Sequence, residues 1–266
     1  MQEHKRSQNA SANNTDLERW NSIAREYDAL ITRGDFFRMH LLNPAMREVV
    51  GPVAGKEILD AGCGQGYLAY ELAREGATVT GVDGAERLIE IARSRYAKTG
   101  GLRFTTLDLT EHLPFADASF DIVIANMVLM DLDPIERLMK CIARVLKPNG
   151  TFVFSLLHPL FETGSLHKNL REFVSRKPPH YAITRYITPH KIPWRIPGAA
   201  VRTSVYHRPL SAYVRALRNA GLAIDELREP TLPADEIAGK SGALRTLAEI
   251  PMFLVARAVK LPRQGV

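Results

Sequence analysis

Three glycines alternate with other residues in the stretch ILDAGCGQGY, which runs from Ile58 to Tyr67 and opens with a short apolar run. Glycine adopts positive φ angles at little cost and lets a ligand approach the main chain closely. Between a strand and a helix, such a loop presents backbone N–H groups and a helix N-terminus, as nucleotide-binding loops do. The spacing G-x-G-x-G differs from the G-x-G-x-x-G of dinucleotide loops, so the glycines alone leave the nucleotide open.

Two aspartates follow this loop at the expected ends of the next two strands. Asp83 closes the run TVTGVD, 21 residues after Gly62, where a carboxylate can accept hydrogen bonds from both ribose hydroxyls. Asp108 lies in the run LRFTTLDL, placed to accept a hydrogen bond from an adenine amino group. The glycines with Asp83 would also fit an NAD-binding protein, so further features have to separate the two classes.

Strands and helices have to alternate to bring these residues to one edge of a sheet. The hydrophobic pattern predicts helices over residues 15–31 and 36–50, and then alternating strands and helices over residues 56–157. The run FDIVIANMVL predicts a nearly apolar fourth strand, and TFVFSLLH predicts a fifth strand entered through a KPNG turn. A helix at LSAYVRALRNAG and strands at LAIDELREP and PMFLVARAVK complete a doubly wound, mostly parallel sheet.

The glycine loop, Asp83, Asp108, FDIVIANMVLMDLD and ARVLKPNGTFVFS, taken in this order, resemble the class I S-adenosylmethionine-dependent methyltransferases. The resemblance implies an α/β fold with a Rossmann-like, doubly wound, seven-stranded sheet, mostly parallel with an antiparallel last strand. It also implies an N-terminal helical cap and an inserted lid. The expected segments are a disordered tail (1–14), the helical cap (15–51), the cofactor-binding core (52–157), an acceptor-binding lid (158–204) and the end of the core fold (205–266).

The same resemblance implies S-adenosyl-L-methionine as the cofactor and S-adenosyl-L-homocysteine as its product, and it assigns residues to them. Asp60 would order the loop and bond, directly or through water, to the cofactor's amino group. Asp83 would hold the ribose. Other positions implied by the resemblance are Asp108 and the backbone of Leu109 for adenine, Asn126 with Met127 for the methionine ammonium, and Gly62, Cys63, Gly64 and Gly66 for the methionine end.

Departures from the patterns of other methyltransferases narrow the acceptor. The residues after the fourth strand read ANMV instead of the Asn/Asp-Pro-Pro-Tyr of amino-directed nucleic-acid enzymes. Neither Cys63 nor Cys141 follows a proline, as the nucleophile of cytosine-5 enzymes does, and the paired-glutamate loop of protein arginine enzymes is missing. We expect a small, largely apolar, aromatic or isoprenoid acceptor, even a diphosphate, methylated at oxygen, nitrogen or carbon in secondary metabolism.

Residues 158–208 carry an unusual concentration of cations, histidines and aromatic residues. Nine lysines and arginines stand against two glutamates, and five of the eight histidines fall here. One interpretation is an aromatic-walled pocket with cations for an anionic or phenolic acceptor. The other is a solvated basic lid whose aromatic residues pack against the domain. We favour the first for the aromatic residues as a group and the second for the individual cations.

Three residues are candidates for direct roles in catalysis. His158 follows the fifth strand at the expected carboxyl edge and is the first choice for a general base. His207 is the second, with a structural bond near the following helix as the alternative. Tyr27 could contact cofactor or acceptor or pack its helix over the cleft, whereas Trp20 is assigned to packing. No cluster has metal-ligand spacing, so no metal is predicted, and Cys63 has no basic partner beside it that would make it a nucleophile.

Composition and charge place the 266-residue chain among ordinary globular proteins, with 45% apolar and 24% charged residues. Two cysteines give no disulfide framework, and no apolar run is long enough to span a bilayer, so we expect a cytoplasmic protein. The net charge of +6 leaves an RNA methyltransferase as one alternative, although a nucleic-acid partner is not our expectation. A non-catalytic cofactor-binding partner protein is another, and a homo-oligomer formed through the first helix or the lid stays open.

Overall fold

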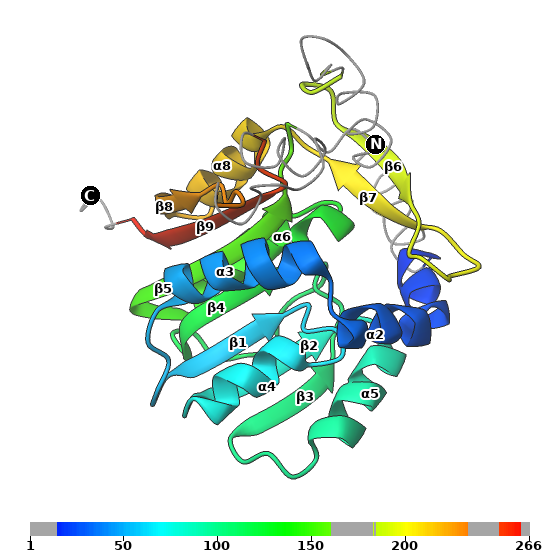
Figure 1. The fold of residues 1–266 in the computed structure, drawn as a ribbon. Helices are drawn as coiled ribbons and strands as arrows, with labels where there is room; N and C mark the ends of the chain where they lie inside the picture. The colour runs from blue at the N-terminus through cyan, green and yellow to red at the C-terminus, as the bar shows by residue number, and fades with distance from the viewer. Residues whose placement is uncertain (1–14, 161–182, 184, 234–249, 262–266) are drawn as a thin grey trace.

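The computed structural model describes residues 15–160, 183, 185–233 and 250–261, and a seven-stranded sheet runs through its centre (Figure 1). The strand order is β3-β2-β1-β4-β5-β9-β8, with β1 to β5 parallel and β9 antiparallel to both its neighbours. This confirms the expected Rossmann-like sheet with an antiparallel last strand. The strands are β1 (Glu57–Ala61), β2 (Thr78–Asp83), β3 (Leu102–Thr106), β4 (Phe120–Asn126), β5 (Leu146–Leu157), β8 (Leu222–Arg228) and β9 (Phe253–Lys260).

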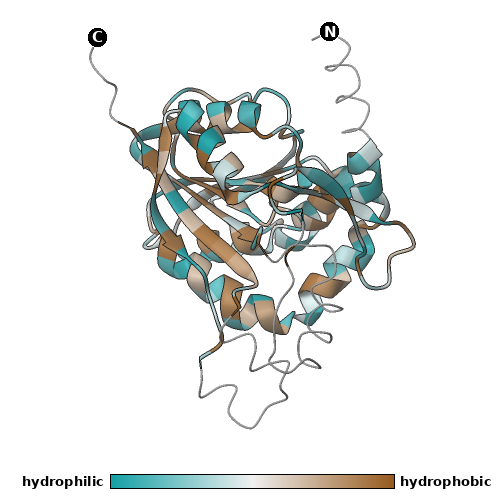
Figure 2. Cartoon of the chain, turned by 90° about the horizontal axis from the view of Figure 1, so that it is seen from above, coloured by the Kyte–Doolittle hydropathy of each residue, from teal (hydrophilic) through white to brown (hydrophobic). Residues whose placement is uncertain are grey.

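Helices cover both faces of this sheet. α3, α4 and α5 pack on one face, and α6 and α8 pack on the other (Figure 1). Seen from above, apolar strands lie between helices whose outward faces are hydrophilic (Figure 2). The helices are α2 (Ala24–Arg33), α3 (Asn43–Val50), α4 (Tyr67–Arg74), α5 (Glu86–Tyr96), α6 (Glu136–Val145) and α8 (Leu210–Asn219), with short helical turns η1 (Arg38–Leu42) and η2 (Leu129–Asp131).

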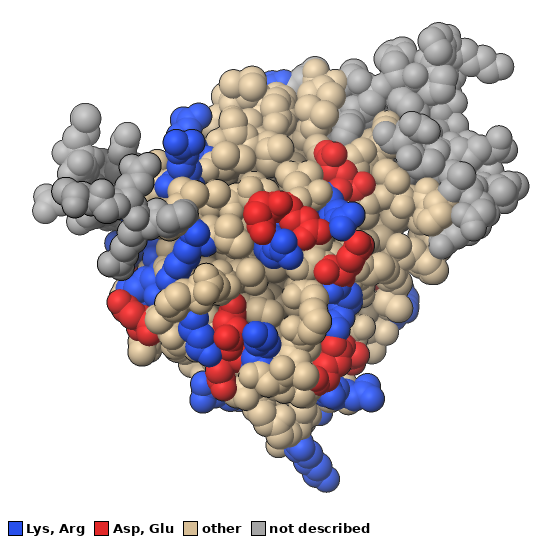
Figure 3. All heavy atoms as spheres, turned by 90° about the vertical axis from the view of Figure 1, so that its left-hand side faces the viewer, with Lys and Arg blue, Asp and Glu red and all other residues tan. Residues whose placement is uncertain are grey.

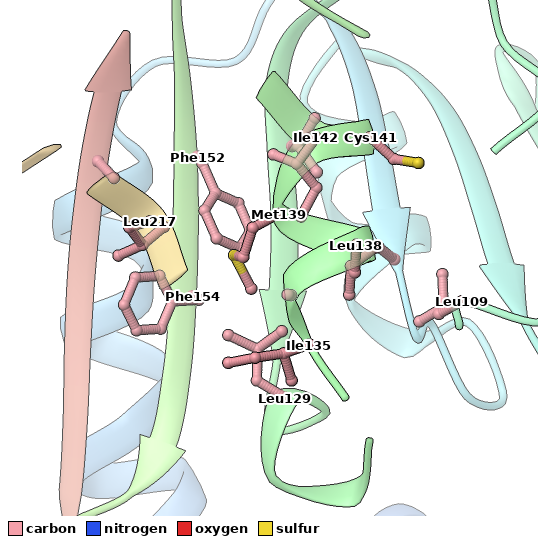
Figure 4. Packing of buried hydrophobic residues seen from close by; sticks show 14 of the residues in the cluster. Leu109, Leu129, Ile135, Leu138, Met139, Cys141, Ile142, Phe152, Phe154 and Leu217 are labelled. Carbon is pink, nitrogen blue, oxygen red and sulfur yellow. The ribbon is translucent and has the colours of Figure 1, made fainter. Parts of the chain in front are cut away.

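The face covered by α6 shows how the core fixes the strands that carry the site. Leu138, Met139 and Ile142 recur at helical spacing on α6 and are at most 1% exposed. Met139 lies beside Phe152 of β5, and Leu138 lies on the side of Leu109 within the same cluster (Figure 4). Each such side chain contributes about 2 kcal/mol when it is fully buried. The ends of β4 and β5 are therefore held firmly from behind.

The N-terminal helical segment is broken where one helix was predicted. Residues 15–22 are helical, Ile23 forms a turn, and α2 follows. Ile23 is 2% exposed and packs with Ile196 and Ala199, whereas Ala24 packs with residues of α5. The break lets the two halves of the segment face different neighbours. The second predicted helix, over residues 36–50, is confirmed, with a π-helical stretch at η1.

Strand β3 ends earlier than predicted. The sequence pattern extended it through Leu109, but β3 stops at Thr106. In the described part of the chain its one sheet neighbour is β2, whose last residue, Asp83, pairs with Thr106. No further partner is available beyond that point, so Asp108 lies in the loop after the strand.

The predicted KPNG turn is an irregularity inside β5. Leu146 already pairs with Phe120, and pairing resumes at Thr151 with Ile122. The four residues between them bulge out of the ladder, with Asn149 at a φ of 63°. The KPNG residues do form a turn, but this turn interrupts β5, whereas the sequence pattern placed it before the strand.

A hairpin of β6 (His190–Trp194) and β7 (Thr203–His207), which the sequence pattern did not predict, lies mostly within the predicted lid. The hairpin stands apart from the large sheet, and β7 contacts η2 (Figure 1). Pro193 obscures the strand pattern in the sequence, but a two-stranded ribbon tolerates it. β7 runs across the boundary predicted after residue 204. The tail 1–14 and residues 161–182, about half of the predicted lid, lie outside the described residues.

Candidate active site

Two adjoining cavities lie at the carboxyl ends of β1, β2 and β4. The first is the larger of the two, and the second lies at the loop after β1. Tyr27, Gly62, Gly64 and Asn126 line both. The sequence-predicted residues that line one or both cavities are Tyr27, Asp60, Gly62, Cys63, Gly64, Asp83, Asp108, Leu109, Asn126 and Met127.

The glycine spacing of the loop follows from what lies against it. A Cβ on Gly62 would lie 2.5 Å from a methyl group of Val128, and one on Gly66 would lie 2.5 Å from the ring of Phe104. Both glycines have φ angles above 80°, and Gly66 caps the start of α4 in the left-handed conformation. Gly64 also has positive φ but more space beside it, so its open side faces the cavity.

The buried carboxylate of Asp60 indicates most clearly that a ligand binds at this loop. The residue is 1% exposed, and neither carboxylate oxygen has a hydrogen-bond partner among the residues described. Burial, and then the carboxylate of Asp83, raises the pKa of Asp60 to about 7, and the nearby backbone N–H of Ala69 offsets a small part of the rise. A buried carboxylate with so little donor support is costly, and an ammonium group placed beside it would reduce that cost. The arrangement fits the amino group of the expected cofactor.

Asp83 and Asp108 are held by backbone N–H groups at the same edge. Asp83 accepts hydrogen bonds from the N–H of Gly64 at 2.9 Å and of Ala85 at 2.8 Å. Burial raises the pKa of Asp83, and these two donors offset part of the rise. Asp108 accepts from the N–H and hydroxyl of Thr110, both at 2.8 Å. Carboxylate oxygens have further lone pairs, so Asp83 so oriented can also accept from ribose hydroxyls.

The backbone turns sharply where β4 meets the cavity. Met127 has a φ of 58°, which is unusual outside glycine. Its N–H donates to the hydroxyl of Ser155 at 2.9 Å, and this hydroxyl donates to the side chain of Asn126 at 2.6 Å. Ser155 is fully buried in β5. Sequence reasoning missed this residue, whose only signal was a lone polar side chain within an apolar strand.

Cys63 lies in the loop with its thiol turned inward. Its Sγ contacts the carbonyl of Gly64 at 3.7 Å. Burial, and then the carboxylates of Asp60 and Asp83, raises the pKa of Cys63 well above its usual value. A neutral thiol of this kind is a poor nucleophile, in keeping with the role of a small loop residue.

The acceptor side of the first cavity is acidic, whereas one interpretation of the sequence was a pocket with cations. Its described lining contains four aspartates and no lysine, arginine or histidine. Two of the four, Asp16 and Asp131, were missed by sequence reasoning, because a single aspartate in a polar helix or loop carries no signal. Apolar walls come from Leu17, Trp20, Val128 and Leu132, so Trp20 faces the cavity as well as packing.

Both predicted histidine bases lie outside the lining of these two cavities. His158 is 6% exposed, and its Nε2 lies 2.8 Å from a carboxylate oxygen of Glu229. His207 is 1% exposed and donates from Nε2 to the carbonyl of Tyr186 at 2.7 Å. Burial lowers the pKa of His207. The geometry gives His207 the structural bond that was its alternative, and the catalytic role of either histidine stays a prediction.

Asp16 joins the first helix to the hairpin. Its carboxylate accepts hydrogen bonds from Lys191 at 2.9 Å, from the hydroxyl of Tyr206 at 2.6 Å and from Arg19 at 2.9 Å. The pKa of Tyr206 is raised by burial and by this bond. Lys191, one of the cations of the predicted basic lid, is therefore committed to a contact inside the protein.

Arg208, another cation of that segment, fixes the turn after β4. It is 8% exposed, donates to the carbonyls of Leu129 and Leu132, and pairs with Asp133 at 2.7 Å. Three hydrogen bonds from one buried guanidinium hold η2 against the hairpin. For these two cations the structural interpretation is the one that the contacts support.

A further cavity borders the loop on its other side. Arg38, Gln65 and Tyr67 line both this cavity and the one at the loop. The side chain of Arg38 has no hydrogen-bond or ion-pair partner in the described part of the chain, whereas nearby Arg95 is bound to Asp28 by two bonds of 2.7 Å. Arg38 could therefore hold an anionic group beside the loop, such as a carboxylate.

Two negative findings hold for the described ranges only. None of their helices is both long enough and apolar enough to cross a bilayer. No group of three or more His, Cys, Asp and Glu side chains could bind a metal ion within those same ranges.

Several methyltransferases are similar to this chain. A family model described as a methyltransferase domain matches residues 59–154. A ubiquinone biosynthesis O-methyltransferase of Sodalis glossinidius is 30% identical over 65% of this chain and 74% of that protein. A demethylmenaquinone methyltransferase of Tropheryma whipplei is 35% identical over 50% of this chain and 55% of that protein. The solved structure of an S-adenosylmethionine dependent methyltransferase from Mesorhizobium loti is 27% identical, with a TM-score of 0.66 over 81% of this chain and 95% of that chain.

Proposed function

The chain belongs to the class I S-adenosylmethionine-dependent methyltransferases, and from this premise we propose that it methylates a hydroxyl oxygen on a small aromatic acceptor. Its cofactor is S-adenosylmethionine. When bound, the cofactor supplies a methyl group that is already activated on a sulfonium. The protein then has to position the acceptor, exclude water and handle one proton.

Asp60 is the single observation that carries the cofactor assignment. Its buried carboxylate has no hydrogen-bond partner among the described residues, and the cofactor's ammonium group matches it in charge and place. Asp83 would bind the ribose, and Asp108 with Leu109 would bind adenine. Arg38 would pair with the cofactor's carboxylate from the other side of the loop.

The acceptor is proposed from the cavity walls and from the relatives. Leu17, Trp20, Val128 and Leu132 form walls suited to a flat apolar ring. The two relatives named above act, by their names, in ubiquinone and menaquinone synthesis, which favours a phenol or quinol ring. The described lining has no cation for a carboxylate or phosphate, so a neutral phenol fits better. The role in secondary metabolism stays a prediction.

Two experiments test this function in sequence. Calorimetric titration should show binding of S-adenosylhomocysteine and none of NADH. Mass spectrometry should then detect methylation of catechol or hydroquinone, with an aromatic amine and geranyl diphosphate as competing acceptors in the same panel. Transfer to the amine or the diphosphate, and none to either phenol, would contradict the proposal.

An RNA acceptor is the main alternative. In the centre and on the right of the face drawn in Figure 3, lysines and arginines are mixed with aspartates and glutamates, whereas several lie close together along the left edge. RNA binding that weakens steeply with rising salt would revive this alternative. Turnover of any acceptor would exclude the second alternative, a non-catalytic cofactor-binding partner protein.

A further inference from the structure

The four carboxylates that line the first cavity differ in what holds them. Asp83 and Asp108 accept hydrogen bonds from backbone N–H groups, and Asp16 accepts them from three side chains. Asp131 is the exception, since its carboxylate accepts no hydrogen bond from any residue that the structure describes. One carboxylate on the acceptor side is therefore left for a ligand.

Asp131 is presented by a rigid turn close to the glycine loop. It ends η2, and its N–H donates to the carbonyl of Val128 at 2.9 Å. Arg208 stabilises the same turn by donating hydrogen bonds to the carbonyls of Leu129 and Leu132. Val128 packs against Gly62, because a Cβ added to Gly62 would lie 2.5 Å from a methyl group of Val128. The carboxylate is thus fixed on the stretch of chain that meets the methionine-end loop.

The surroundings of Asp131 suit a group that gains a proton. Burial, and then the carboxylates of Asp83 and Asp16, raises its pKa well above the usual value. Other charged groups in this region are Asp108 after β3, Arg208, whose guanidinium is committed to the turn, and the two cations that bind Asp16, Lys191 and Arg19. A base is most effective when its pKa approaches the working pH.

The described cavity also restricts how a phenol could react. Nearby cations would lower the pKa of a phenol, but none lines this cavity among the described residues. Among the described residues, a lining group is then the nearest available proton acceptor. His158 and His207 lie outside the lining, Asp16 is already bound to three donors, and Asp83 and Asp108 face the expected cofactor.

We propose that Asp131 is a catalytic residue that accepts the hydroxyl proton of the acceptor; this rests on the proposed function. The acceptor oxygen bonds to the methyl carbon as the carbon–sulfur bond breaks and its electron pair stays on sulfur. The O–H proton passes to the Asp131 carboxylate and from there to water. Charge is balanced, because the cationic sulfonium becomes a neutral thioether and the proton carries the positive charge away.

The test compares Asp131→Asn and Asp131→Glu with two phenols of different acidity. Catechol is neutral at neutral pH, whereas 4-nitrocatechol ionises far more readily. Asp131→Asn should lower kcat for catechol by about 10²- to 10⁴-fold, and should lower it far less for 4-nitrocatechol, which needs no base. Asp131→Glu should restore part of the catechol rate. Asp117→Asn is the matched control, since the Asp117 side chain is 76% exposed on the surface.

A spectroscopic readout separates this role from a structural one without turnover. On the S-adenosylhomocysteine complex of the wild type, bound 4-nitrocatechol should show phenolate absorbance at a pH where the free compound is neutral. On the Asp131→Asn complex it should not, although S-adenosylhomocysteine binds both proteins equally. Phenol binding and absorbance unchanged by the substitution, or equal loss of rate with both phenols, would overturn the inference alone. No binding or methylation of either phenol by the wild type would overturn the proposed function and the inference with it.

Discussion

The cofactor side and the acceptor side of the cavity are built from different kinds of contact. On the cofactor side, the N–H of Gly64 binds Asp83, only 19 residues away in the sequence. On the acceptor side, Asp16 is bound by Lys191 and Tyr206, which are 175 and 190 residues away. The first set is main chain to side chain and the second is side chain to side chain. The cofactor side therefore depends on backbone shape, and the acceptor side on long-range pairing.

This difference predicts unequal tolerance to substitution. A loop at positive φ with a neighbour 2.5 Å from an added Cβ has no room to adapt. A contact such as Asp16 with Lys191, in which the lysine side chain is 40% exposed, can be replaced by water at modest cost. The cofactor side should be brittle and the acceptor side adjustable, which suits a fold that serves many acceptors.

The largest effect is expected from Gly62→Ala. The added methyl group would collide with Val128, and the alanine would have to adopt a φ of 83°, which is unfavourable for an L-residue. We therefore expect the free energy of unfolding to fall by about 3 kcal/mol and the affinity for the cofactor to fall as well. Gly55→Ala is the matched control, because Gly55 has a φ of 72° but nothing near its Cβ position. It should lose about 1 kcal/mol and keep its affinity. Denaturant unfolding and titration with S-adenosylhomocysteine measure both, and equal losses would contradict the close-packing explanation.

The next effect is a pH dependence that Asp60 should cause. Its folded-state pKa of about 7 exceeds the ordinary value of 3.8, so the folded protein holds a proton that the unfolded chain releases. Stability from this group is present at low pH and is lost as pH rises toward 7. Without cofactor, the stability of Asp60→Asn relative to the wild type should therefore increase by about 2 kcal/mol when the pH is raised from roughly pH 5 to pH 8.

Saturating S-adenosylhomocysteine provides the control for this prediction. Its ammonium group should pair with the wild-type carboxylate and remove most of the pH-dependent difference. Unfolding curves at both pH values, with and without ligand, decide the matter. A stability difference that stays constant across the range would mean that Asp60 titrates normally and would weaken the cofactor assignment.

The smallest effect is expected on the acceptor side, from Tyr206→Phe. The substitution removes one hydrogen bond to Asp16 and leaves the bonds from Lys191 and Arg19 in place. Stability should fall by about 1 kcal/mol, and the affinity for S-adenosylhomocysteine should change by less than about threefold. Thermal unfolding and the same titration check this. A large loss of cofactor affinity would show that the two sides are coupled and would break the comparison.

The sequence predicted what backbone requirements dictate. The parallel sheet, the glycine loop and Asp83 follow from local pattern and spacing, and Asp60 follows from the resemblance to the methyltransferase family. The structure places the loop and both aspartates at one edge of the sheet. The end of β3 was missed because it depends on the length of β2, its partner. The β6–β7 hairpin was missed because Pro193 masks its alternation.

The acceptor side could not be predicted in the same way. Asp16 and Asp131 gain meaning only when the first helix, the hairpin and η2 meet around the cavity. His158 looked well placed at the end of β5, but its ring is bound to Glu229, 71 residues away. Contacts between residues so far apart in the sequence produce no hydrophobic periodicity that could predict them. Aspartate and histidine are also common residue types, so the residues on the acceptor side gave no signal by themselves.

The most direct test of the central claim uses S-adenosylmethionine with a labelled methyl group. The protein and the cofactor are added to an extract of the cells that produce it, and macromolecules are then separated from organic-soluble compounds. We predict label in the organic fraction, on a compound that contains a methylated aromatic hydroxyl. Label confined to RNA or protein would contradict the account, because an acceptor of that size would need a footprint that the acidic cavity does not provide.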